Sequence, residues 1–242
     1  MTASLTYLSL FSGIGGLDLG LDRAGLTCVG QVERDPYCRS VLTTHWPEVP
    51  KHDDVRTAPS WWFARPRPVI RLVAGGFPCQ PFGRGGLRLG TSDPRWGWPL
   101  FYDLVRAVRP EYVLVENVPG LLDHADAFGT VLGDLAALGF DAEWSLLSAC
   151  ALGAPHTRER LFVLAYPAGK RLVQRGGIQR PPHRDPKRHV HHWAAQPEPH
   201  RVADGVPRRV DRNRALGNAV VPAVGEFIGR LIVASAGQVT AP

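Results

Sequence analysis

Short apolar runs alternate with helical stretches along the first part of this 242-residue chain. Apolar runs cover residues 5–11, 26–33, 69–76 and 111–117, and the last two are continuous, as in strands buried on both faces of a sheet. The stretches between them have the spacing of amphipathic helices. Because strands that alternate with helices form parallel sheets, we expect an α/β fold with a doubly wound, mostly parallel sheet and helices on both faces.

The later part of the chain is less regular. Residues 140–150 and 158–166 have the pattern of a late pair of strands. The periodicity then stops, and it returns at 218–235, where we expect one terminal helix that Pro222 interrupts early.

The positive charge of the chain is concentrated in one segment. The net charge is +6, and residues 167–213 contain 11 Lys and Arg against 4 Asp and Glu. The rest of the chain is therefore nearly neutral. A local surplus of this kind predicts a surface that binds a polyanion, and the alternative is a solvated, partly disordered linker.

The cysteine positions and the hydropathy argue against a disulfide-rich, a zinc-binding or a membrane-spanning protein. None of the four cysteines lies in a CxxC pair, so we expect neither a disulfide framework nor a structural zinc site, and a reduced, cytosolic setting. His189, His191 and His192 fit a zinc site poorly, because they are closely spaced and lack cysteine partners, and a titrating patch that faces DNA is the favoured interpretation. We expect no membrane span, since no run of about 18 apolar residues occurs, and no signal peptide at the N-terminus.

Four loops follow the carboxyl ends of the expected strands, where ligands bind in open α/β sheets. FSGIGG comes at the end of the strand at 5–11, Glu33 ends the second strand, GGFPCQPFG comes at the end of the strand at 69–76, and ENVPG ends the strand at 111–117. This convergence predicts one site built from all four loops.

The first two loops suit a nucleoside cofactor. Glycines in FSGIGG let a ligand approach the backbone at a helix N-terminus. Glu33 lies twenty positions after Gly13, where an acidic side chain binds ribose hydroxyls. The spacing is not GxGxxG, so a dinucleotide fits poorly, and glycines that serve packing are the alternative.

The other two loops carry groups suited to covalent and acid–base chemistry. Pro78 and Pro81 stiffen the loop around Cys79 and indicate a presented thiol, although a cysteine packed as a small hydrophobe is the alternative. Glu116 ends an apolar strand, so burial would raise its pKa and make it a proton donor, unless it is a structural cap.

Two arginines begin the last expected strand. Strand alternation places Arg158 and Arg160 on one face, where they could clamp a phosphate or a carboxylate. A surface ion pair is the alternative.

The chain as a whole resembles the C5-cytosine methyltransferases that use S-adenosylmethionine. The resemblance covers residues 5–166 and 214–233. FSGIGG resembles the first motif of that family, GGFPCQPFG its catalytic loop, ENVPG its glutamate motif, HTRER its arginine motif and ALGNAVVP its last motif.

The resemblance implies methyl transfer from S-adenosylmethionine to C5 of cytosine in double-stranded DNA, through a covalent Cys79–C6 intermediate with base flipping. It implies catalytic roles for Cys79, Glu116, Asn117, Arg158 and Arg160. It implies cofactor contacts from Phe11, Gly13, Ile14, Gly16, Glu33, Arg34, Asp54, Val55, Pro78, Leu100, Asn218, Ala219 and Val220. We expect DNA contacts from Gln80, Arg84, Arg88, Arg95, His156, Arg208 and Arg209.

On this basis we divide the chain into three parts: a catalytic and cofactor-binding domain (1–166), a short basic target-recognition segment (167–213) and a C-terminal helix that returns to the domain (214–242). We expect the Gly- and Arg-containing loop 82–99 to close over the flipped base. We also expect a monomer without metal, in the cytoplasm of a bacterial or phage-infected cell and associated with the nucleoid.

Two departures from the family pattern keep other functions open. His156 stands where the family usually has Gln, and the target-recognition segment is short. A tRNA cytosine-C5 methyltransferase is one alternative, because RNA loops present bases that are already unstacked. A catalytically inactive nucleic-acid-binding relative is the other.

Overall fold

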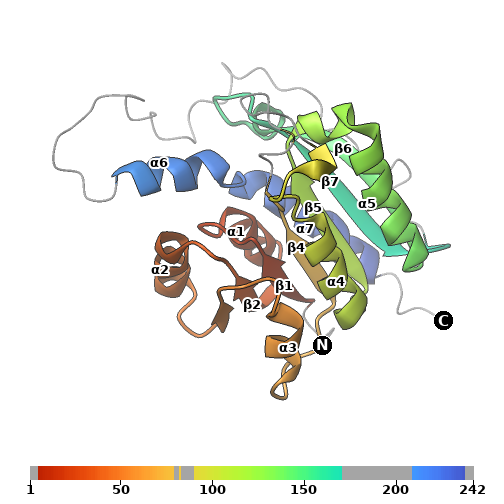
Figure 1. The fold of residues 1–242 in the computed structure, drawn as a ribbon. Helices are drawn as coiled ribbons and strands as arrows, with labels where there is room; N and C mark the ends of the chain where they lie inside the picture. Colours follow the sequence, from red (N-terminus) through yellow and green to blue (C-terminus); the bar gives the residue numbers. More distant parts are fainter. Residues whose placement is uncertain (1–4, 79–81, 83–89, 171–208, 238–242) are drawn as a thin grey trace.

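Seven strands form one twisted sheet in the computed structural model, which describes residues 5–78, 82, 90–170 and 209–237 (Figure 1). The strand order is β3-β2-β1-β4-β5-β7-β6. The first five strands in this order are parallel, and β7 runs antiparallel to both of its neighbours. The strands are β1 (Thr6–Leu10), β2 (Thr27–Val32), β3 (Lys51–His52), β4 (Leu72–Gly75), β5 (Tyr112–Asn117), β6 (Phe140–Ser148) and β7 (Glu159–Pro167). The expected mostly parallel α/β sheet is confirmed.

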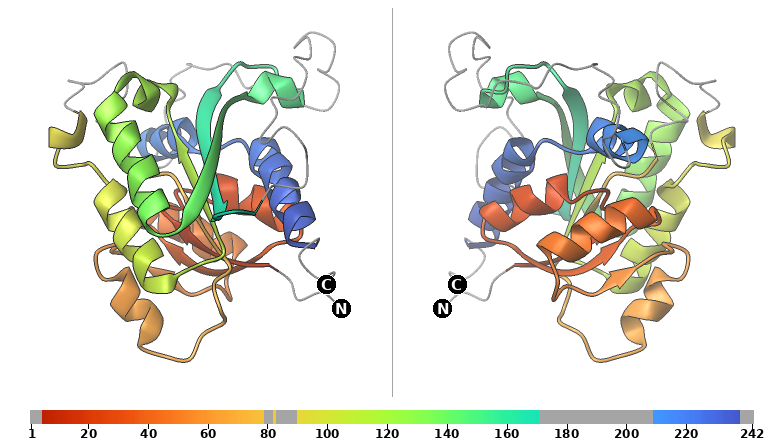
Figure 2. Two further views of the ribbon diagram at one scale, coloured as in Figure 1. Left: turned by 90° about the vertical axis from the view of Figure 1, so that its right-hand side faces the viewer. Right: turned by 90° about the vertical axis from the view of Figure 1, so that its left-hand side faces the viewer.

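Helices cover both faces of this sheet (Figure 2). The α-helices are α1 (Gly16–Arg23), α2 (Pro36–His45), α3 (Ala58–Phe63), α4 (Trp98–Val108), α5 (Ala125–Ala137), α6 (Arg209–Asn218) and α7 (Pro222–Gly237). Short 3-10 turns are η1 (Gly90–Ser92), η2 (Pro119–Asp123) and η3 (Ala149–Leu152). Helices α3, α4 and α5 pack on one face, and α1 and α7 pack on the other.

The alternation of β5 decides where its polar end points. Val113 and Val115 belong to the apolar cluster under α4 and α5, whereas Leu114 belongs to the cluster under α1 and α7. Since successive strand residues point to opposite faces, Glu116 shares the face of Leu114, and Asn117 faces the other way.

The expected start of α2 is confirmed. The Asp35 side chain accepts hydrogen bonds from the backbone N–H groups of Tyr37 (2.8 Å) and Cys38 (3.1 Å), and Pro36 occupies the first turn. Both features are typical of helix N-termini.

The expectation of one terminal helix at 218–235 is wrong. Two helices are present, and residues 219–221 between them are not helical. Pro222 lacks an N–H group and disfavours the helical conformation of the residue before it, so it begins α7 rather than interrupting it. The sequence shows no apolar periodicity over α6, because this helix buries a small side chain, Ala215, whereas its larger apolar residues Val210 and Leu216 are exposed.

The C-terminal helices also bear on the membrane expectation. Residues 210–237 are long and apolar enough, by length and composition, to cross a membrane. However, Val224, Ile228 and Ile232 of α7 are buried in the cluster that contains Leu17 and Leu21 of α1. One face of α7 therefore packs against the domain.

Candidate active site

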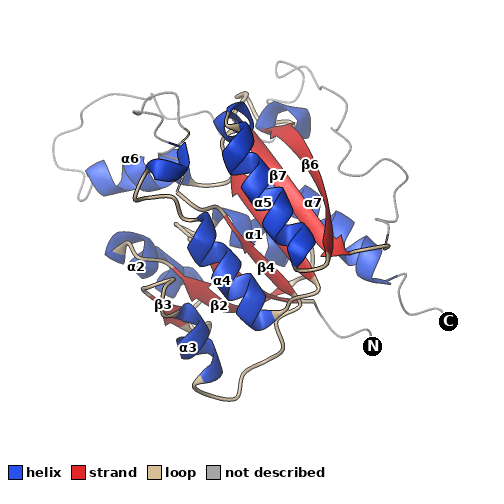
Figure 3. Ribbon diagram, turned by 45° about the vertical axis from the view of Figure 1, so that its right-hand side comes forward, coloured by secondary structure: helices blue, strands red, loops and turns tan. Residues whose placement is uncertain are grey.

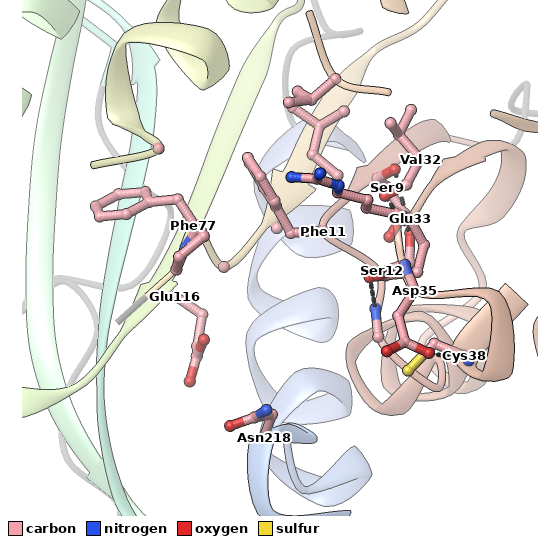
Figure 4. A pocket seen from close by; sticks show the side chains of 18 of the residues that line it. Ser9, Phe11, Ser12, Val32, Glu33, Asp35, Cys38, Phe77, Glu116 and Asn218 are labelled. Carbon is pink, nitrogen blue, oxygen red and sulfur yellow. Dashed lines mark hydrogen bonds between the residues drawn. The ribbon is translucent and has the colours of Figure 1, made fainter. Parts of the chain in front are cut away.

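A cavity of about 560 Å³ lies at the carboxyl edge of the sheet (Figure 4). It is lined by the loops that follow β1 to β4, by the end of β5, by the start of β7 and by residues 214–220. Of the residues named from the sequence, the lining includes Phe11, Gly13, Gly16, Glu33, Arg34, Asp54, Val55, Pro78, Arg95, Leu100, Glu116, Arg160, Asn218, Ala219 and Val220. The four loops therefore meet at one site. Ile14, Asn117, His156 and Arg158 are described but are not part of this lining.

The loop after β1 has an unusual backbone. Gly13 has φ +55°, and Phe11 has φ +51°, which is uncommon for a residue with a side chain. Strained conformations of this kind are found at ligand sites, where the surrounding structure holds them in place. Here the strained residue is itself part of the cavity wall.

Glu33 is fixed by two backbone donors. Its Oε2 atom accepts a hydrogen bond from the N–H of Gly13, and its Oε1 atom accepts one from the N–H of Asp35, both at 2.7 Å. Each carboxylate oxygen still has a lone pair for a donor in the cavity. An acceptor held in one place in this way suits a ligand that presents two hydroxyl groups.

The segment 218–220 lies directly on the first turn of α1. A Cβ atom on Gly16 would lie 2.2 Å from the carbonyl oxygen of Val220. This contact closes the wall of the cavity beside Asn218, which comes from the end of α6 (Figure 4).

We expect Gly16→Ala to weaken the fold and the cofactor site together. The new methyl group must push Val220 away, and overpacking of this kind costs about 1–3 kcal/mol. Urea unfolding measures the loss. Gly129→Ala is the matched control, because a Cβ on Gly129 of α5 meets no atom within 4 Å and should stabilise the helix by up to about 1 kcal/mol. Equal stability of Gly16→Ala and the wild type would contradict the prediction.

Glu116 projects into the cavity on the side of Asn218 (Figure 4). Its side chain is 12% exposed, and its Oε1 atom lies 3.2 Å from Nε of Arg160. Burial raises the pKa of Glu116 to about 7, although the nearby charges of Arg160 and Arg158 act in the opposite direction. The group can therefore hold and release a proton near neutral pH.

The same carboxyl group lies against the loop that leads to Cys79. A Cβ atom on Gly76 would lie 2.3 Å from Oε2 of Glu116. Gly76 and Pro78 both line the cavity. The proton-holding group and the backbone just before the thiol are therefore neighbours.

Asn117 supports this loop from behind the cavity. Its side-chain amide donates a hydrogen bond to the carbonyl oxygen of Phe77 (3.2 Å), and its carbonyl oxygen accepts one from the N–H of Val118 (2.9 Å). The side chain is buried. Both hydrogen bonds of the Asn117 side chain are thus with backbone groups, and Asn117 does not line the cavity.

The arginines at the start of β7 connect different parts of the site. Arg160 pairs with Glu116, and Nη1 of Arg158 donates a hydrogen bond to the carbonyl oxygen of Gly217 (2.8 Å). The pKa of His156 is lowered, first by burial and then by the charge of Arg158. Arg158 thereby links the residue just before β7 to α6.

Several residues and segments named in the sequence analysis are not placed by the structure. Cys79, Gln80, Arg84, Arg88, Arg208 and most of the basic segment, including the three histidines at 189, 191 and 192, lie outside the described residues. Arg209 begins α6. Within the described ranges there is no group of three His, Cys, Asp or Glu side chains suited to a metal ion.

Sequence reasoning missed other residues that line the cavity. Trp96 and Arg214 are among them, and so are Ser9, Asp18 and Cys38. Arg214 pairs with Asp35 at 2.5 Å and so holds α6 above α2 (Figure 3). Asp35 was visible as a helix cap, but no local pattern distinguished Arg214, which pairs with a residue 179 positions away.

Comparison with known proteins gives a consistent family. The family model for C-5 cytosine-specific DNA methylase matches residues 5–202. Type II methyltransferase M.DsaV of Dactylococcopsis salina is 31% identical over 167 residues, which cover 67% of this chain and 46% of the relative. M2.BsuMI of Bacillus subtilis (strain 168) is 34% identical over 168 residues, which cover 66% and 42%. The chain thus spans just under half the length of these two relatives.

A solved structure has the same architecture. The crystal structure of the S. pombe Dnmt2 methyltransferase is 27% identical to this chain, with a TM-score of 0.57, and the match covers 69% of this chain and 52% of that one. The Spodoptera frugiperda DNMT2 structure has a TM-score of 0.59 at 24% identity, which supports the fold alone.

Proposed function

The chain belongs to the C-5 cytosine-specific DNA methylase family, and from this premise we propose that it methylates C5 of cytosine in double-stranded DNA with S-adenosylmethionine as the methyl donor. The observation that carries the proposal is the position of Glu116. A carboxyl group with a pKa of about 7 lies in the same cavity as the Glu33 carboxylate and against the backbone that leads to Cys79.

The cavity fits the methyl donor in size and in chemistry. Its volume of about 560 Å³ lies in the usual range of about 300–1,000 Å³ for small-molecule sites. Glu33 would accept hydrogen bonds from the ribose hydroxyls, Asp54 and Val55 would meet the adenine, and Asn218 to Val220 would hold the methionine part. When bound, S-adenosylmethionine supplies an electrophilic methyl group on a positively charged sulfur.

Cys79 and Glu116 would make the base reactive. C5 of cytosine is a poor nucleophile while the ring is aromatic. Addition of the Cys79 thiolate to C6 breaks the aromaticity, and a proton or hydrogen bond from Glu116 at N3 stabilises the charge that develops. Once C5 has been methylated, loss of the C5 proton and elimination of Cys79 restore the ring.

Arg160 would hold Glu116 in position for this step. Its guanidinium lies 3.2 Å from the carboxyl group, and it cannot lose its own proton. Arg160 and Arg158 would also act as partners of the substrate, with Arg158 tied to α6 through Gly217.

The DNA substrate must bring its base to this cavity out of the stacked duplex. The basic surplus of residues 167–213 would supply phosphate contacts. A bacterial cytoplasmic location, as for a protein of a restriction–modification system, is part of this proposal.

Bisulfite sequencing tests the proposal. Genomic DNA and tRNA from cells that express the chain are compared with the same nucleic acids from cells that express Cys79→Ala. We expect protected cytosines in DNA, in a short sequence context, with the wild-type chain alone. Protection confined to tRNA would replace the DNA substrate by RNA, and no protection in either would overturn the proposal.

We expect Glu33→Ala to weaken binding of S-adenosylmethionine by about tenfold or more. Hydrogen bonds to a charged acceptor contribute at most about 1.5–3 kcal/mol each, and the variant loses two of them. Isothermal titration calorimetry measures the change. Glu48→Ala, an exposed carboxylate outside the cavity, is the matched control and should bind as the wild type does. Unchanged affinity in Glu33→Ala would mean that the cofactor binds elsewhere.

A further inference from the structure

One tryptophan contacts the aromatic residues on both sides of the Cys79 segment. Phe77 precedes this segment and Phe82 follows it, and both side chains are almost fully buried. The Trp96 ring lies 5.2 Å from the Phe77 ring and 5.0 Å from the Phe82 ring, edge to face in both cases. The two ends of the four-residue stretch 78–81 are therefore joined through a single side chain.

The backbone at both ends of this stretch is also held. The carbonyl oxygen of Phe77 accepts a hydrogen bond from Asn117. The carbonyl oxygen of Phe82 packs so closely on Gly120 that a Cβ there would lie 2.4 Å from it. At Gly97, the residue after Trp96, a Cβ would lie 2.7 Å from Cδ of Pro78. The tryptophan thus belongs to a segment that packs directly on the start of the stretch.

Trp96 is fixed by contacts that do not involve Cys79. Its backbone N–H donates a hydrogen bond to the backbone carbonyl oxygen of Asp93 (2.9 Å). The Asp93 carboxylate is buried, accepts a hydrogen bond from the N–H of Arg95 (2.9 Å), and pairs with the Arg95 guanidinium at 2.6 Å. The turn at 93–96 is therefore a firm support for the ring.

Trp96 also lines the cavity together with Phe77 and Pro78. Its ring thus contacts the two residues that flank the Cys79 segment and also borders the proposed cofactor site. We propose that Trp96 is a positioning residue, which fixes the Cys79 segment so that the thiol reaches C6 of the flipped cytosine. This inference rests on the function proposed above.

A reaction that needs no methyl donor separates this role from cofactor binding. The Cys79 thiolate forms the S–C6 bond, the electron pair of the C5–C6 double bond moves to C5, and C5 takes a proton from solvent. Loss of the original C5 hydrogen as a proton then returns the pair, and the S–C6 bond breaks to release the thiolate. In D₂O the net result is exchange of the C5 hydrogen of cytosine for deuterium, which mass spectrometry of a duplex DNA substrate detects.

We expect Trp96→Ala to slow this exchange, and kcat for methylation, by about 100-fold, because a displacement of about 1 Å at a reacting group has that effect. Because the exchange needs no methyl donor, its loss reports on the Cys79 segment even though Trp96 lines the proposed cofactor cavity. KM for DNA should change by less than about threefold. Trp96→Phe, whose ring is too small to reach both neighbours, should lose about tenfold and thus rescue part of the rate.

Trp144→Ala is the matched control, because its exposed indole packs on Phe128 away from the cavity. It should exchange at the wild-type rate. Wild-type exchange in Trp96→Ala, or in Trp96→Phe if the alanine variant does not fold, would overturn the role of Trp96. So would an equal loss in Trp144→Ala. Absence of exchange in the wild-type protein would instead contradict the proposed function.

Discussion

Cys79→Ala should abolish methyl transfer, with no product above the uncatalysed background, while S-adenosylmethionine binds with nearly wild-type affinity. Methylation needs a nucleophile at C6 to make C5 reactive, and an alanine methyl group cannot supply one. The proposed cofactor contacts come from other residues that line the cavity, such as Glu33 and Asn218, so removal of the thiol should leave them intact. A tritiated methyl donor measures transfer, and calorimetry measures binding.

A covalent trap gives a second measurement of the same role. Duplex DNA with 5-fluorocytosine at the target should form a stable adduct with the wild-type protein, because fluorine cannot leave C5 as a proton does. The Cys79→Ala variant should form none. Cys150→Ala removes a buried thiol of η3 outside the cavity and should form the adduct as the wild type does. Methylation by Cys79→Ala at the wild-type rate would contradict the covalent mechanism.

Glu116→Gln should lower kcat by about 100-fold or more, since general acid catalysis typically contributes about 10²–10⁴-fold. Glutamine can still donate a hydrogen bond to N3, but it cannot deliver a proton. In the wild type the acid must be protonated, so kcat should fall as the pH rises through about 7, the pKa of Glu116. This falling limb should be absent from the pH profile of the variant.

The matched control for this prediction is Glu143→Gln. Glu143 lies on β6, outside the cavity, and its Oε1 atom accepts a hydrogen bond from the Tyr166 hydroxyl (2.6 Å). This variant should keep the wild-type rate and its pH dependence. A falling limb near pH 7 that persists in Glu116→Gln would assign the titration to another group.

The same titration should appear in stability. Because burial raises the pKa of Glu116 from 4.5 to about 7, the folded protein keeps a proton that the unfolded chain has lost. The contribution of this protonated group to the free energy of unfolding is fully present below pH 4.5 and is lost as the pH rises through about 7. Each pKa unit corresponds to about 1.4 kcal/mol, so the wild type should lose about 3 kcal/mol relative to Glu116→Gln over this range. Urea unfolding at several pH values measures it.

Local patterns in the sequence determined the architecture of the sheet and the place of the site. Continuous apolar runs indicated strands buried on both faces, and residues at the carboxyl ends of parallel strands must meet at one edge. Gly13, Glu33 and Glu116 could be assigned to that edge because each lies at a strand end. The direction of the Glu116 pKa shift also followed from its apolar neighbours in the chain.

The tertiary structure decided the features that depend on residues distant in the sequence. The sequence of α6 has no apolar periodicity. This helix contacts the rest of the chain through the ion pair of Arg214 with Asp35 and the hydrogen bond from Arg158 to the carbonyl oxygen of Gly217, rather than through an apolar face. Asn117 faces away from the cavity because successive residues of a strand point to opposite faces of the sheet, and the preceding residue, Glu116, points into the cavity. Trp96 contacts the aromatic rings of Phe77 and Phe82 on both sides of the Cys79 segment, and a local pattern cannot encode which rings a folded chain brings together.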